Sequence, residues 1–132
     1  MKKVGLLLFI IATMTSCASI QLTPKQTCLW GMNVYNTQYE RFIRDTVKPD
    51  YVEDILRPPS FGSKQTLVIT EEMLRTDLTE EKRESLITRK DILYDLFQAV
   101  QTCDKAIIAM EEPSEENTDD LIHLINRLLE DL

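Results

Sequence analysis

The segment TEEKRESLITRKDILYDLFQAVQTCDKAIIAM, residues 79–110, has the longest helical pattern in this chain. Its apolar side chains recur at spacings of three and four residues, which places them along one face of an α-helix. Thr79 is a favourable N-cap, and Pro113 ends the helix. The apolar stripe consists of Leu86, Leu93, Leu96, Val100, Cys103, Ile107 and Met110, and Ile92, Phe97 and Ile108 broaden it.

A second stripe lies nearer the N-terminus. Thr23-Pro24 is a good helix start, and the break at Lys48-Pro49 ends the pattern, so the spacing predicts a helix over 24–46. The stripe consists of Cys28, Met32, Tyr35, Tyr39 and Phe42, flanked by Leu29 and Ile43. Asp50 can cap a short helix over 51–56.

The remainder divides into a loop region and one more helix. Residues 57–63 are rich in proline and small residues, which predicts a loop. Residues 65–70 contain a β-like run without an evident partner strand, and we expect extended loop there, then a short turn over 71–75. A last helix, capped by Ser114 or Thr118, is expected to bury Leu121, Ile122, Leu124, Ile125, Leu128, Leu129 and Leu132.

Three amphipathic stripes predict an all-α fold, a small antiparallel bundle of three to four helices formed by residues 23–132. Cys28 lies near the start of the first helix and Cys103 near the end of the long one. Antiparallel packing would bring the two ends together, so we predict a Cys28–Cys103 disulfide. Two separate buried thiols are the alternative.

The first seventeen residues have the three parts of a bacterial export signal. Lys2 and Lys3 precede an apolar run, Val4–Met14, which is too short to cross a bilayer as a helix. The segment Met14-Thr15-Ser16-Cys17 resembles the lipobox of bacterial lipoproteins, although Met14 stands where leucine is usual. The alternative is an ordinary secretory signal cut after Ala18 or Ser19.

The resemblance implies a signal peptide over 1–16, lipid attachment at Cys17 and an anchored linker over 17–22. In that class the cysteine receives a diacylglycerol and a further acyl chain, such as palmitate, and no other cofactor is expected. Ala18-Ser19 lacks the aspartate that retains lipoproteins in the inner membrane. The implied location is therefore the cell outer membrane with the body in the periplasm, or outside the single membrane of a Gram-positive cell.

The charge restricts the partners. The whole chain has a net charge of −7, and removal of the signal with its two lysines makes it more negative. Such a surface repels nucleic acid and anionic headgroups, so no nucleic-acid partner is expected.

We find no pattern of catalytic or metal-binding residues in the sequence. Asp119 and the single histidine, His123, are spaced as half of a metal site, and a zinc site needs three or four ligands. No Gly-x-Ser-x-Gly or phosphate loop occurs. The paired glutamates lie at expected helix ends or in loops, where solvated charge is ordinary. We therefore expect no enzyme and no metal.

Two aromatic residues are candidate partner contacts. Trp30 lies off the core stripe, so it either reaches the lipid headgroups or packs under the last helix. Phe61 lies in the proline-rich loop and is either presented to a partner or tucked inward.

These patterns predict a lipid-anchored envelope protein that acts as a non-enzymatic interaction or scaffold module. A small apolar-ligand carrier and a phage or mobile-element exclusion lipoprotein are the alternatives.

Overall fold

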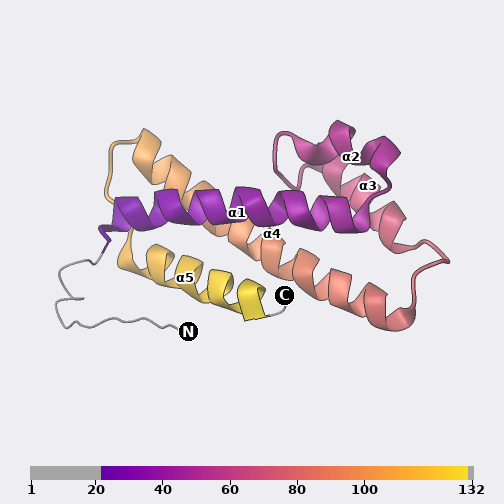
Figure 1. Cartoon of the computed structure of the whole chain (residues 1–132). Coiled ribbons are helices and arrows are strands. Elements are labelled where there is room, and N and C mark those ends of the chain that lie inside the picture. The colour runs from indigo at the N-terminus through magenta and orange to yellow at the C-terminus, as the bar shows by residue number, and fades with distance from the viewer. Residues whose placement is uncertain (1–21, 131–132) are drawn as a thin grey trace.

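The computed structural model describes residues 22–130. The predicted signal peptide, Cys17, most of the linker and Leu132 lie outside the described residues. Five helices and no strands form this part of the chain, which confirms the all-α prediction (Figure 1). They are α1 (Pro24–Thr46), α2 (Pro49–Leu56), α3 (Ser63–Met73), α4 (Glu80–Ile108) and α5 (Glu115–Glu130).

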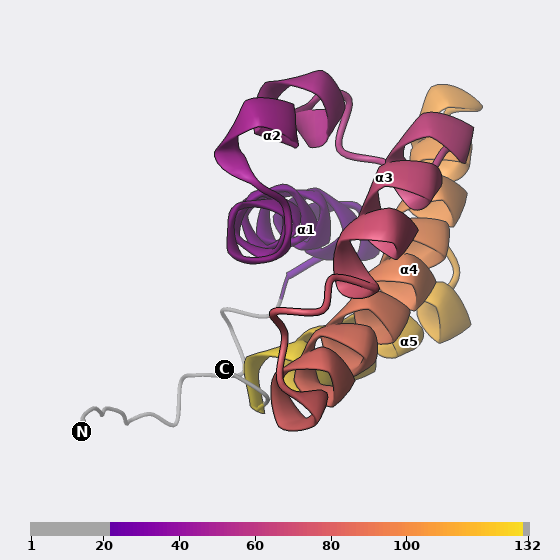
Figure 2. The ribbon, with the colours of Figure 1, turned by 90° about the vertical axis from the view of Figure 1, so that its right-hand side faces the viewer.

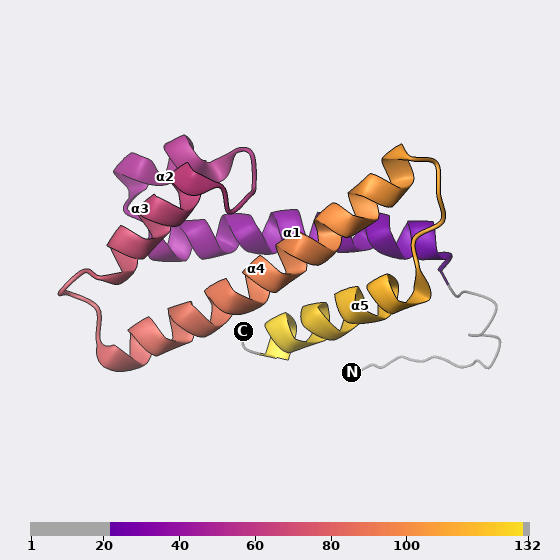
Figure 3. The ribbon, with the colours of Figure 1, turned by 180° about the vertical axis from the view of Figure 1, so that it is seen from behind.

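Helices α1 and α4 form the spine of the molecule. They run in opposite directions and cross, and α5 packs against both of them where α1 begins and α4 ends (Figures 1 and 3). At the other end, α2 and α3 pack against each other and against α1, and α3 also contacts α4 (Figure 2). Within the described chain, α5 contacts neither α2 nor α3. The two ends of the spine therefore present different surfaces.

The ends of α1 and α4 follow local rules. The Thr23 side chain accepts a hydrogen bond from the Gln26 backbone N–H at 3.1 Å, and the Gln26 side chain accepts one from the Thr23 N–H at 2.9 Å. This reciprocal capping box, with Pro24 at the first helical position, fixes the start of α1. At the start of α4, the Thr79 side chain accepts a hydrogen bond from the Lys82 N–H at 3.1 Å.

The prediction of extended loop over 65–70 is wrong, because these residues belong to helix α3. The run Leu67-Val68-Ile69 is helical, because Gln65, Ile69 and Met73 recur every four residues and are buried against the rest of the fold. Tertiary packing outweighs the modest β-propensity of this run. The bundle accordingly has five helices in its described part rather than three to four.

The core contains most of the predicted stripe residues, with two kinds of exception. Helix α4 ends at Ile108, so Ile108 and Met110 are exposed, Met110 at 94 %. Met110 adopts a left-handed backbone conformation with φ of 60° that ends the helix. Leu29, Ile122 and Leu129, which the sequence predicts on buried faces, lie at the edges of their stripes and remain partly exposed.

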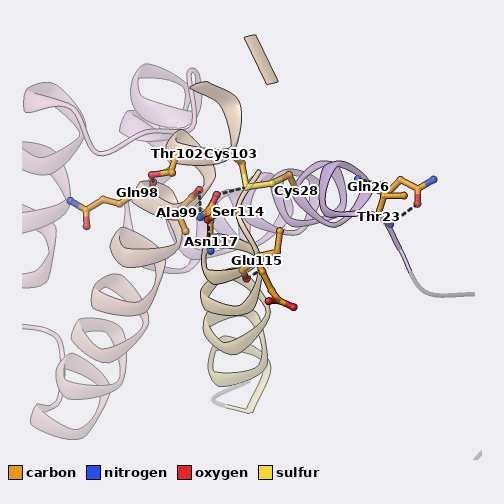
Figure 4. Close-up of a disulfide and its surroundings, with 11 residues drawn as sticks. Thr23, Gln26, Cys28, Gln98, Ala99, Thr102, Cys103, Ser114, Glu115 and Asn117 are labelled. Carbon is orange, nitrogen blue, oxygen red and sulfur yellow. Dashed lines mark hydrogen bonds between the residues drawn. A yellow bond between two sulfur atoms is a disulfide. The ribbon is translucent and has the colours of Figure 1, made fainter. Parts of the chain in front are cut away.

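A disulfide joins Cys28 of α1 to Cys103 of α4, as the sequence predicted (Figure 4). Both cysteines are fully buried. Asn117 of α5 lies against the same site, with Oδ1 3.2 Å from Cys103 Sγ and Nδ2 donating to the Ala99 carbonyl at 3.3 Å. The disulfide therefore fastens the end of the bundle where α1, α4 and α5 meet.

A glycine sets the distance between α1 and α5. A β-carbon placed on Gly31 would lie 2.8 Å from Leu121 Cγ and still closer to a methyl group of the same side chain. Only a residue without a side chain permits this approach, so Gly31 brings the two helices together.

Candidate functional site

Phe61, one of the two predicted contact residues, belongs to an aromatic cluster between α1 and α4. Its ring centroid lies 5.8 Å from that of Tyr39 and 5.7 Å from that of Tyr94, both in edge-to-face geometry. Phe97 and Tyr35 extend the cluster by stacking 5.8 Å apart. The structure thus places Phe61 half-buried among aromatic neighbours, which are favourable partners for its ring.

Two tyrosine hydroxyls hold the proline-rich loop and α2 onto α1. Tyr39 Oη donates to the Ile55 carbonyl at 2.7 Å, and Tyr35 Oη donates to the Pro59 carbonyl at 3.0 Å. Burial raises the pKa of Tyr39 to about 12, an effect that the Ser60 backbone partly opposes. Burial and the nearby Tyr39 raise the pKa of Tyr35 further. Both hydroxyls therefore remain protonated hydrogen-bond donors at neutral pH.

Trp30, the other predicted contact residue, lines a surface groove between the first turns of α1 and α5. We name this the α1–α5 groove; its volume is about 510 Å³. The Trp30 side chain is 40 % exposed, so it lies neither wholly in solvent nor under α5. The lining consists of Leu22, Pro24, Thr27, Trp30, Glu115, Thr118, Asp119 and Ile122.

The α1–α5 groove is lined by apolar side chains, by carboxylates and by two buried threonines, Thr27 and Thr118. Leu22 and Ile122, beside Trp30, are 52 % and 39 % exposed. Glu115 and Asp119 supply carboxylates on the α5 side. Neither carboxylate is paired with a basic side chain among residues 22–130. The groove therefore combines partly exposed apolar area with uncompensated negative charge.

A second groove of about 490 Å³ lies between α4 and α5. Its lining includes His123 together with Asp95, Glu116 and Asp120, whereas Asp119 lines the α1–α5 groove. The predicted half-site of Asp119 and His123 is therefore divided between two grooves. Among the described residues, no three histidine, cysteine or carboxylate side chains are grouped closely enough to hold a metal ion.

Both grooves are open and partly lined by carboxylates, which distinguishes them from the enclosed, mainly apolar cavities that hold small apolar ligands. Across residues 22–130, every helix is too short or too polar to cross a membrane. Searches against protein-family models, curated proteins and solved structures gave no match to this chain.

The sequence indicates Trp30 as a candidate partner contact, but it does not indicate the residues that lie beside Trp30 in the groove. The sequence predicts Leu22 in the linker and Ile122 on the buried face of the last helix. The spacing contained a hint, because Ile122 and Leu129 are seven residues apart and both lie on the flank of the α5 stripe. What the pattern could not show is that α1 begins beside that flank.

Proposed function

We propose that this chain is a lipid-anchored, non-enzymatic interaction module of the bacterial envelope. The lipobox-like segment ending at Cys17 supports the anchor, and Ala18-Ser19 favours the outer membrane with the helical body in the periplasm. The α1–α5 groove is the surface through which the body engages a partner protein.

The observation that carries this proposal is that three partly exposed apolar side chains, Leu22, Trp30 and Ile122, line one groove close in sequence to the proposed anchor. Apolar surface gathered in one place and bordered by polar groups is typical of interaction sites. Leu22 is five positions after Cys17, and an extended chain spans at most about 3.6 Å per residue, so their Cα atoms lie no more than about 18 Å apart. Acylation at Cys17 would therefore hold the groove beside the membrane surface.

The anchor is tested by the intact mass of the protein extracted from membranes, with alkylation before and after reduction. We expect the mass of Cys17–Leu132 plus acyl chains, with two cysteines alkylated only after reduction. An unlipidated mass beginning at Ser19 or Ile20 would refute the anchor.

The partner surface is tested by site-specific photocross-linking in cells. A benzophenone amino acid replaces Ile122 in the groove, and the matched control places it at Tyr51, an aromatic side chain of α2 that is 50 % exposed at the other end of the molecule. We expect one envelope protein to be cross-linked from position 122 and not from position 51. Equal yields from both positions, or no product from either, would contradict the proposal.

A further inference from the structure

We infer that the α1–α5 groove binds a cationic amphipathic segment of the partner, in which lysine or arginine side chains accompany apolar ones on one face. This inference rests on the proposed function, because it specifies the chemistry of the partner at the same groove.

The apolar part of such a segment fits the apolar side chains that line the groove. Trp30, Leu22 and Ile122 all retain between 39 % and 52 % of their exposure, and Pro24 adds a further apolar surface. A partly exposed tryptophan flanked by aliphatic side chains is the arrangement that most often contributes strongly to binding when a partner excludes water from it. Polar segments would leave this area in contact with water.

The cationic part fits the carboxylates of the groove. Between Glu111 and Asp120 the chain has six carboxylates and no lysine or arginine, and two of them, Glu115 and Asp119, line the α1–α5 groove. The glutamates of the first turn of α5 are explained by the helix dipole, but Asp119 lies in the second turn, beyond the reach of that effect. Its carboxylate lines the groove without a basic partner among the described residues. Charge complementarity therefore selects a basic segment.

The same charge disfavours other occupants of this groove. Two copies of the chain meeting at this surface would bring Glu115 and Asp119 against the same groups of the second copy, which costs energy. An anionic lipid surface is repelled for the same reason. A basic segment is attracted to Glu115 and Asp119 while its apolar side chains cover Leu22, Trp30 and Ile122.

Trp30 provides the test, because it is the only tryptophan in the chain and lines the groove. The full-length protein is titrated with a synthetic leucine–lysine peptide without tryptophan, and in parallel with a leucine–glutamate peptide and a serine–lysine peptide of equal length. We expect a saturable blue shift of Trp30 emission with the leucine–lysine peptide alone, and weaker binding as salt is raised.

Variants assign the binding to the groove. The double variant Glu115→Gln/Asp119→Asn is expected to lower affinity for the leucine–lysine peptide about tenfold, which corresponds to about 1.4 kcal/mol and is within reach of two exposed charge pairs together. The matched control Glu53→Gln/Asp54→Asn removes two exposed carboxylates of α2 and is expected to change affinity less than twofold. Ile122→Gln is expected to weaken binding, and Leu67→Gln on the exposed face of α3 is not.

Equal losses in the two charge variants would overturn the inference, because they would show attraction to net charge alone. A blue shift produced by zwitterionic vesicles and not by the peptide would overturn it in favour of a lipid surface. A blue shift that grows with protein concentration alone would overturn it in favour of a second copy.

The photocross-linking experiment separates this inference from the proposed function. A partner captured from position 122 whose yield survives Glu115→Gln/Asp119→Asn would refute the charge selection and leave the interaction module intact. Absence of any captured partner would refute the proposed function itself.

Discussion

Removal of the disulfide is expected to cost a large part of the stability of this domain. Cys28 and Cys103 are separated by 75 positions, and both side chains are fully buried. In the chain-entropy treatment, a cross-link closing a loop of this length lowers the entropy of the unfolded chain enough to stabilise the fold by about 4.5 kcal/mol at 25 °C. A domain of this size is commonly stable by about 5–15 kcal/mol, so its loss leaves a marginal protein.

The perturbation is Cys28→Ala/Cys103→Ala, and the assay is urea unfolding followed by far-ultraviolet circular dichroism. With a slope of roughly 1.5 kcal/mol per molar urea, the midpoint is expected to fall by about 3 M. The slope itself should rise, because the unfolded chain without its cross-link exposes more surface. The wild-type protein under reducing conditions should show a similar loss.

The single variants provide the internal control. Cys28→Ala and Cys103→Ala each open the same loop, so each should cost nearly as much as the double variant, and their effects should be far from additive. A loss below about 1.5 kcal/mol in the double variant, or additive single losses, would refute the reasoning that the covalent closure of the loop stabilises this fold.

Three further predictions concern the packing of α1, the end of α4 and the tyrosine hydroxyls. Gly31→Ala is expected to lower the free energy of unfolding by about 1–3 kcal/mol in urea unfolding, because the new methyl group overlaps Leu121. This overlap outweighs the gain of up to about 1 kcal/mol in helix propensity. A more stable variant would show that the close approach does not constrain the helices. Met110→Gly is expected to stabilise the fold by about 1 kcal/mol and so to raise the thermal midpoint. Glycine adopts the left-handed conformation without strain, and little packing is lost because Met110 is 94 % exposed. No change in the midpoint would show that the backbone is unstrained there. The raised pKa of Tyr39, about 12 against 10 in the unfolded chain, predicts that stability is fully present below pH 10 and falls as the pH rises toward 12, because the unfolded chain releases the proton first. Tyr39→Phe should flatten part of this decline and cost about 1 kcal/mol at pH 7 through loss of the hydrogen bond to Ile55, and an unaltered pH profile would contradict the assignment.

The disulfide also bears on the α1–α5 groove. Cys28 lies on α1 two residues before Trp30, and Asn117, beside Cys103, lies on α5 two residues before Asp119. The covalent bond fixes the start of α1 to the end of α4, and Asn117 holds the first turn of α5 to α4 through its hydrogen bond to the Ala99 carbonyl (Figure 4). A preformed groove reduces the ordering cost of binding, which is the physical basis for expecting a defined partner rather than nonspecific adhesion.

Local patterns were sufficient to predict helices α1, α4 and α5. Their stripes recur every three or four residues, and their starts are specified by Thr23-Pro24, Thr79 and Ser114, whose side chains bond nearby backbone N–H groups. The disulfide partners were also predictable, because each cysteine belongs to a stripe and antiparallel packing brings them together. The helices depend on neighbouring residues, whereas the disulfide pairing also required the expectation that the two helices pack antiparallel.

Only the tertiary structure decided the remaining features. Helix α3 forms because its face packs against the rest of the fold, and Phe61 joins Tyr39, Tyr94 and Phe97, which come from distant parts of the chain. The α1–α5 groove exists because Leu22 and Ile122, far apart in sequence, lie beside Trp30. Periodicity shows which face of a helix is apolar, but which neighbour covers each edge of that face depends on how the helices cross. The close approach of α1 to α5 depends on the contact between Gly31 and Leu121, and no local pattern contains that contact.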